Sequence, residues 1–167
     1  MKQEQVADLI SVLDDEYEFY RQLNDFAVRK KDAIIENEVE ELTEIIEEEQ
    51  VIIEKINKKE DKRDQLLRKL VEEEGLDAEA PDFEELLSAV KKEEQQDRLQ
   101  EIREKLLQVI DDLHQKNEDN KILLEEAIKF NNFSYNMIAQ ILEPHANTYN
   151  PEGDSDDSTS HILDHRA

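Results

Sequence analysis

The sequence predicts an all-α fold: an elongated antiparallel bundle of three long helices with coiled-coil character, a short connecting helix and a disordered acidic tail. Glu, Lys, Leu, Ile and Gln dominate the composition, and all five are compatible with long helices. Two glycines and three prolines leave few turns for a protein built from many strands. With 37% hydrophobic and 40% charged residues, a narrow apolar seam is expected rather than a thick core. We expect the bundle over residues 1–143 and the tail over 144–167.

The first long helix is predicted over residues 3–36, because apolar residues return there at helical spacing. The stripe consists of Leu9, Ile10, Leu13, Tyr17, Tyr20, Leu23, Ala27, Ile34 and Ile35. Val12, Phe19 and Phe26 are seven residues apart and widen this stripe on one side. Asn37 is the expected stop, since asparagine tolerates the left-handed conformation that ends many helices.

A second long helix is predicted over residues 39–74, with a narrower apolar stripe. That stripe consists of Leu42, Ile45, Ile46, Ile52, Ile53, Ile56, Leu66, Leu67 and Leu70. Glu49, Glu60 and Arg63 interrupt it. We expect Glu60 and Arg63 to form an ion pair at the edge of the bundle, where such pairs contribute roughly 0–1 kcal/mol.

A connector and a short helix follow the second long helix. Gly75 provides a C-terminal stop, and Pro81 prevents the helix from continuing. Asp82 can cap a short helix, which we predict over residues 82–90.

The last helix is predicted over residues 91–143, a run without glycine or proline that Pro144 ends. Its first half has one stripe: Leu99, Ile102, Leu106, Val109, Ile110 and Leu113. Asn117 and Asn120 continue this stripe, and two roles are open for them. They can hydrogen-bond across helices and set the register, which we favour, or they can cap a break in the helix. Asp, Ser, Asn and Pro dominate the predicted tail and favour disorder.

Residues 122–142 are apolar around most of the predicted helix. At 100° per residue the bundle side comprises Leu124, Ala127, Ile128, Tyr135, Ile138 and Leu142, and a second stripe comprises Leu123, Phe130, Phe133, Met137 and Ile141. The apolar arc is roughly 240° wide, whereas one packed face needs little more than 100°. The segment therefore needs covering on two sides, of which its own bundle provides one.

Three kinds of cover for the second stripe remain open. The first helix can supply it through Phe19 and Phe26. A second copy of the chain can cover it by self-association. A different protein can lay an amphipathic helix against it, a mode for which the adaptable Met137 side chain is well suited.

The formal net charge of −24 excludes several classes of partner. Nucleic acids and anionic membranes are bound by clustered Lys and Arg, and this chain would repel both. No window is apolar enough to span a bilayer, and the start of the chain has no signal-peptide pattern, so we expect a cytoplasmic protein.

The sequence gives no sign of an enzyme. It has no cysteine, and its two glycines cannot build a phosphate-binding loop. Paired carboxylates are frequent because 45 residues are acidic, and a thin bundle offers no pocket to shift their pKa values. We expect no catalytic site, cofactor or metal.

The end of the last helix resembles the FlgN-type flagellar export chaperones. In "NEDNKILLEEAIKFNNFSY" an Asn-x-x-Asn-x-x-Leu-Leu segment precedes an apolar, aromatic helix, as in that family; the matching residues are Asn117, Asn120, Leu123 and Leu124. Upstream, Glu60 and Arg63 resemble the family's Glu-x-x-Arg step. Downstream, "TYNPEG" resembles its Tyr-Gly-x-x-Gly element, with Tyr149 and Gly153 kept and Asn150 departing from the glycine.

The resemblance implies a binding activity without chemistry. Such chaperones hold hook–filament junction proteins in the cytoplasm and deliver them to the type III export gate. It implies client binding by the C-terminal amphipathic helix, here through the second stripe: Leu123, Phe130, Phe133, Met137 and Ile141. It also implies docking of Tyr149 on the cytoplasmic domain of the gate. We expect the free protein to be a monomer; the alternative is a structural coiled-coil protein that self-associates through the same stripe.

Overall fold

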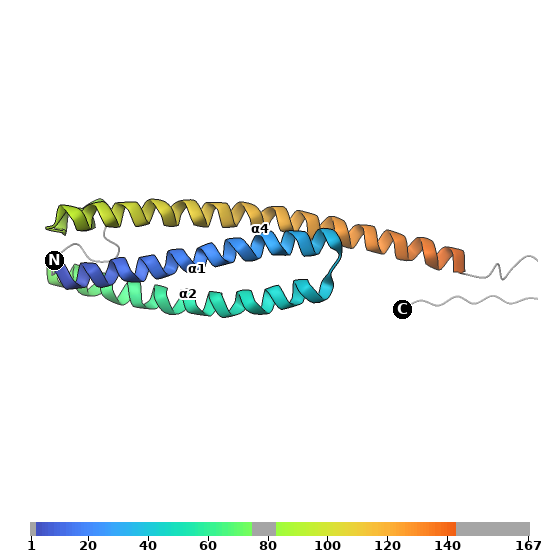
Figure 1. The fold of residues 1–167 in the computed structure, drawn as a ribbon, viewed down its shortest axis with the longest axis horizontal. Coiled ribbons are helices and arrows are strands. Elements are labelled where there is room, and N and C mark those ends of the chain that lie inside the picture. The colour runs from blue at the N-terminus through green and yellow to red at the C-terminus, as the bar shows by residue number, and fades with distance from the viewer. Residues whose placement is uncertain (1–2, 75–82, 143–167) are drawn as a thin grey trace, which may run out of the picture. The chain divides into compact units, whose positions relative to one another are not determined.

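The structure is a computed structural model that describes residues 3–74 and 83–142, and within these ranges it contains four helices and no strand. They are α1 (Gln3–Glu36), α2 (Val39–Glu74), α3 (Phe83–Ala89) and α4 (Glu93–Leu142) (Figure 1). The predicted all-α fold is confirmed, and the predicted bounds of the four helices lie within two residues of the observed ones. Gly75, Pro81 and the predicted tail lie outside the described residues. The chain divides into two units after Phe130, and the helical bundle belongs to the first.

The turn between α1 and α2 is built around Asn37, as predicted. Its backbone is left-handed, with φ 58°. The Asn37 amide donates to the carbonyl of Ile34 at 3.2 Å, and the Glu38 amide donates to the carbonyl of Ala33 at 2.9 Å. These two bonds satisfy carbonyls that the end of a helix would otherwise leave unpaired, so the chain reverses with little loss of hydrogen bonding.

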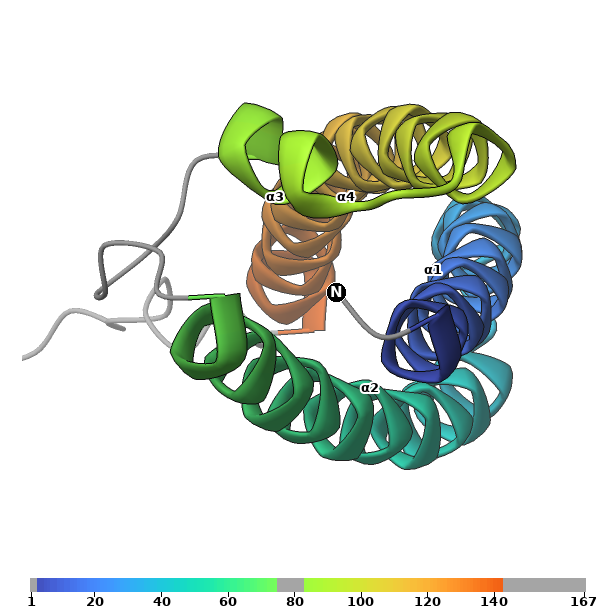
Figure 2. The ribbon, with the colours of Figure 1, turned by 90° about the vertical axis from the view of Figure 1, so that its left-hand side faces the viewer.

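The long helices run up, down and up. Contacts between α1 and α2 join early to late residues, as in the 3.0 Å pair of Gln5 and Glu73, which makes these two helices antiparallel. Contacts between α1 and α4 rise together along both helices, from Gln3 and Gln95 to Ala27 and Asn120, so these two are parallel. In the first unit α1 lies between α2 and α4, and Figure 2 shows the three long helices as an arc with α3 beside the start of α4.

The core consists of two apolar clusters at different levels of the bundle. One lies where the start of α1 and the end of α2 meet α3 and the start of α4. It consists of Val6, Leu9, Leu70, Leu86, Val90 and Leu99. The other joins α1, α2 and α4 through Leu23, Ala27, Ile52, Ile56 and Leu113. The apolar stripes predicted for the three long helices thus supply most of the buried residues.

Buried asparagines attach α4 to α1. Asn24 of α1 donates to the carbonyl of Val109 at 2.8 Å and accepts a hydrogen bond from Lys116 at 2.6 Å. Asn120 of α4 donates to the carbonyl of Ala27 at 2.7 Å. Because α4 is continuous through this region, the alternative of a helix break is wrong and the register role of Asn120 is supported.

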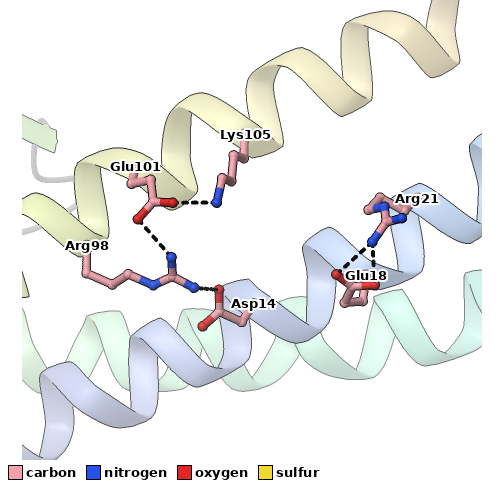
Figure 3. A network of polar contacts seen from close by, with 6 residues as sticks. All are labelled: Asp14, Glu18, Arg21, Arg98, Glu101 and Lys105. Atoms are coloured by element: carbon pink, nitrogen blue, oxygen red, sulfur yellow. Dashed lines mark hydrogen bonds and ion pairs between the residues drawn. The ribbon is translucent and has the colours of Figure 1, made fainter.

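An ion-pair network on the surface adds a second link between α1 and α4 (Figure 3). The Arg98 guanidinium bridges Asp14 of α1 at 2.7 Å and Glu101 of its own helix at 2.8 Å, and Lys105 also pairs with Glu101. These side chains are about two-fifths exposed or more, so each pair contributes only about 0–1 kcal/mol.

We predict that Leu99→Ala destabilises the protein by about 2–5 kcal/mol, because Leu99 is fully buried between α1, α2 and α3 and its removal leaves a cavity. Leu107 is the matched control, since it lies two turns further along α4 and is 57% exposed. Leu107→Ala should change the free energy of unfolding by no more than about 0.5 kcal/mol. Urea unfolding followed by circular dichroism measures both. Equal effects of the two substitutions would contradict this description of the core.

Candidate functional site

The exposed apolar residues of the described chain gather at the end of α4. Seventeen large apolar side chains are exposed, and ten of them lie between residues 122 and 142. These ten are Ile122, Leu124, Ile128, Phe130, Phe133, Tyr135, Met137, Ile138, Ile141 and Leu142. Concentrations of this kind mark surfaces that bind other molecules, since monomers rarely expose so much contiguous apolar surface. We call residues 122–142 the terminal segment.

Within the first unit, the terminal segment keeps some contact with the bundle. Leu123 and Ala127 are half-buried, whereas Phe130 is 68% exposed. Of the two predicted client residues in this part, Phe130 is therefore a free surface residue, and Leu123 is shared with the bundle.

The part of α4 in the second unit, residues 131–142, exposes the other three predicted client residues. Phe133, Met137 and Ile141 are 62%, 48% and 77% exposed. They are spaced four residues apart, so they lie along one side of the helix. No residue between 131 and 142 is charged, in a chain of net charge −24. This part of the helix is suited to contacts with an apolar partner.

The predicted division of the terminal segment into a bundle side and a free side is wrong. Leu124 and Ile128, expected on the bundle side, are exposed, while Leu123 is half-buried. The buried side of α4 repeats every seven residues, at Leu99, Leu106, Leu113 and Asn120. A projection at 100° per residue drifts about 20° from that repeat with every heptad. The predicted bundle side was therefore displaced around the helix axis from the observed one.

Phe19 and Phe26 do not shield the terminal segment. Both pack against the cluster that contains Leu23, Ile52 and Ile56. Lys55 lies over the Phe19 ring at 5.9 Å, and Arg29 lies over the Phe26 ring at 5.8 Å. For Phe130, the exposed stripe residue of the first unit, internal cover by the first helix is therefore contradicted. Tyr149, the predicted gate-docking residue, lies outside the described residues.

Inside the bundle, the predicted ion pair of Glu60 with Arg63 is replaced by a contact between helices. Arg63 donates to Glu16 of α1 at 2.7 Å and lies 3.8 Å from Asp64. Glu60 instead accepts a hydrogen bond from the hydroxyl of Tyr20 at 3.4 Å. The Glu16 side chain is only 1% exposed, and a buried carboxylate attracts the nearest guanidinium more strongly than a solvated one does.

Glu16 is a buried acid with incomplete partners. Its Oε2 accepts the bond from Arg63, but its Oε1 is buried and has no hydrogen-bond partner. An unpaired buried acceptor costs about 1–3 kcal/mol. Burial raises the pKa of Glu16 above its ordinary value of 4.5, while Arg63 acts in the opposite direction. Sequence analysis missed this residue; its signal was a carboxylate on the apolar stripe, between Leu13 and Tyr20.

The described residues contain neither a metal site nor a transmembrane helix. Within 3–74 and 83–142, no three or more His, Cys, Asp or Glu side chains are arranged to hold a metal ion. The four helices of these ranges also lack a stretch long and apolar enough to cross a membrane.

We predict that Glu16 makes stability depend on pH. Because the pKa of Glu16 is raised on folding, the folded state binds this proton more tightly, and the resulting stabilisation is lost as the pH rises through the folded pKa. Wild type should gain stability relative to Glu16→Gln as the pH falls from about 7 toward 4.5. Urea unfolding of both proteins across this range tests it. A difference that does not change, or that changes in the opposite direction, would show that Arg63 outweighs burial.

Comparison with known proteins gives a match to a family model. A family model described as FlgN protein matches residues 1–156. No curated protein and no solved structure matches the chain. The family match supports a general role as a flagellar export chaperone. Since the match covers well over half of the sequence, the chain belongs to the FlgN family.

Proposed function

We propose that this protein is a cytoplasmic chaperone that binds hook–filament junction proteins and delivers them to the type III export gate. The observation that carries the proposal is the terminal segment, with its ten exposed large apolar side chains. A chain that folds around a thin core has no structural need for this segment. Exposed apolar residues lower solubility, and binding of a client to the terminal segment would account for their presence.

The client surface that we propose consists of Leu123, Phe130, Phe133, Met137 and Ile141. Four of these residues are exposed, and Leu123 supplies an edge against the bundle. Ile122, Tyr135, Ile138 and Leu142 are exposed too and extend the area available to a client. The expected occupant is an amphipathic helix from the C-terminal part of a junction protein, whose apolar face packs against these residues.

Burial of this surface can supply the free energy of client binding. Each large apolar side chain contributes about 1.5–3 kcal/mol when it is fully removed from water. Association costs offset part of the total, so a few well-packed side chains dominate the affinity. Phe130 and Met137 are suited to that part, because an aromatic ring buries a large area and a methionine adapts its shape to the partner.

We predict that Phe130→Gln combined with Met137→Gln weakens client binding by at least about tenfold, because two large apolar contacts are lost. Glutamine is a good helix former, so helicity and folding should be unchanged. The measurement is calorimetric titration with the C-terminal helical segment of a hook-junction protein from the same source. Wild type should bind one client per chain with negative ΔCp.

The matched control for this experiment is Val51→Gln. Val51 lies on α2 and is 53% exposed, so its substitution removes an exposed apolar side chain outside the terminal segment. Client affinity should not change in this variant. Wild type that fails to bind the client, yet forms oligomers that the double variant lacks, would instead identify the terminal segment as a self-association surface.

A separate prediction concerns delivery. Tyr149→Ala should abolish binding to the cytoplasmic domain of the export gate while client affinity stays within about twofold of wild type, because the proposed docking residue is outside the client surface. Pull-down of the chaperone–client complex by the purified gate domain measures delivery, and the calorimetric titration measures client binding. Unchanged gate binding would remove Tyr149 from the proposed docking site.

A further inference from the structure

A pocket of about 400 Å³ lies within the first unit, and none of its lining residues belongs to the terminal segment. All four helices line it, and its residues fall between Leu9 and Ile110. Leu107 and Ile110 line the pocket and are 57% and 41% exposed, so the pocket opens to solvent along α4. Nothing in the proposed binding of clients by the terminal segment uses this pocket.

The walls of the pocket are shaped like a trough between helices. On α1 they run from Leu9 to Tyr20, and on α4 they run from Leu99 to Ile110. Each wall covers eleven residue steps, or about 17 Å at the rise of an α-helix, which is three turns. Residues on each wall recur at helical spacing, so the trough runs parallel to the helices. An occupant helix of about three turns matches this length.

The charges that line the trough balance one another. It contains Glu16, Glu60, Arg63 and Arg103, in a chain whose net charge is −24. Arg103 lies over the Phe83 ring at 4.5 Å, and Tyr20 donates to Glu60. The remaining lining residues are apolar leucines, isoleucine and phenylalanine. An apolar helix can therefore approach this surface without the repulsion that the rest of an acidic chain exerts on acidic partners.

Glu16, which lines the trough, carries one oxygen atom without a hydrogen-bond partner. Glu16, with a side chain 1% exposed, lines the pocket, and its Oε1 accepts no hydrogen bond while Arg63 occupies Oε2. A carboxylate oxygen only accepts hydrogen bonds, and a cationic donor makes the strongest ones. Oε1 is closed to solvent in this arrangement, so an occupant with one Lys or Arg in an apolar face would complete the bonds of Glu16 once the carboxylate turns toward the trough.

We propose that the trough is a second protein-binding site, which takes an amphipathic partner helix whose apolar face carries a single Lys or Arg directed at Glu16. The occupant adds a helix of about three turns to the bundle, against the walls that α1 and α4 supply. The single cation sets the register of the occupant along the trough, and the leucine walls supply the affinity. Because residues of the terminal segment take no part, this site and the client surface can be occupied at the same time.

The test uses the full chain and two synthetic helical peptides of about 18 residues. Both carry Leu at the heptad a and d positions; one has a central Lys in the apolar face, and the other has Met at that position. Charges on the outer face are adjusted so that both peptides are neutral overall, which removes general attraction to an acidic protein. Calorimetric titration should give an affinity at least about tenfold higher for the Lys peptide.

Two variants assign this preference to the trough. Glu16→Gln should bind both peptides equally, because the amide at this position no longer offers an unpaired charged acceptor. Leu107→Glu should weaken binding of both peptides by about tenfold or more, since it places a charge at the exposed mouth. Val51→Glu is the matched control: it adds the same charge at a residue 53% exposed on α2 and should leave both affinities unchanged.

A third variant separates this site from the client surface. Phe130→Gln combined with Met137→Gln should bind both peptides as wild type does, even where it has lost its client. Loss of peptide binding in that variant would place the peptides on the terminal segment and overturn the proposal. The proposal would also be overturned if wild type bound neither peptide, or if the preference for the Lys peptide persisted in Glu16→Gln. A third such outcome is sedimentation showing that a second copy of the chain occupies the trough and is released by Leu107→Glu.

Discussion

A buried carboxylate in the middle of a thin apolar seam sets the layout of this bundle. Glu16 lies along α1 between the two core clusters, and Arg63 of α2 reaches it at 2.7 Å. Removing one partner of such a pair typically costs 3–5 kcal/mol, although the pair as a whole adds little net stability. We therefore infer that the pair mainly fixes register: sliding α2 along α1 would leave Glu16 charged and unpaired, whereas leucine contacts alone would tolerate the shift.

Cations also pair with acids across the α1–α2 hairpin. There are 21 Lys and Arg against 45 Asp and Glu, so each cation is valuable for relieving repulsion between helices. Arg29, Lys30 and Lys59 each pair with an acid on the neighbouring helix of the α1–α2 hairpin. The pairs of Arg29 and Lys59 are partly exposed and contribute about 0–1 kcal/mol each, whereas the side chains of Lys30 and Glu49 are only 15% and 13% exposed. Their larger effect is on specificity, since any other alignment of two acidic helices would bring like charges together.

Local signals in the sequence predicted the helices well, and contacts between helices were harder to predict. The turn at Asn37 follows from the conformational preference of asparagine, which depends on no distant residue. The partner of Arg63 depends on the packing of α1 against α2, so the nearby Glu60 was the wrong choice. The sides of the terminal segment were misjudged for a related reason: supercoiling changes the helical repeat, and a small angular error accumulates until Leu123 and Leu124 exchange roles.

The helix α4 combines a structural and an exposed part because its composition changes along its length. In its first half, charged residues lie between the buried residues Leu99, Ile102, Leu106, Val109 and Leu113. One face of the helix is therefore exposed to solvent, and the other packs against the bundle. Its last twelve residues, 131–142, carry no charge, so no face is strongly solvated. Such a segment would promote aggregation in a neutral protein. A net charge of −24 opposes contact between copies while leaving short-range apolar packing with a suitable helix intact. Charge and exposed apolar surface thus act in opposite directions on association: like charges repel a second copy of the chain, and exposed apolar side chains favour packing against a partner of matching shape.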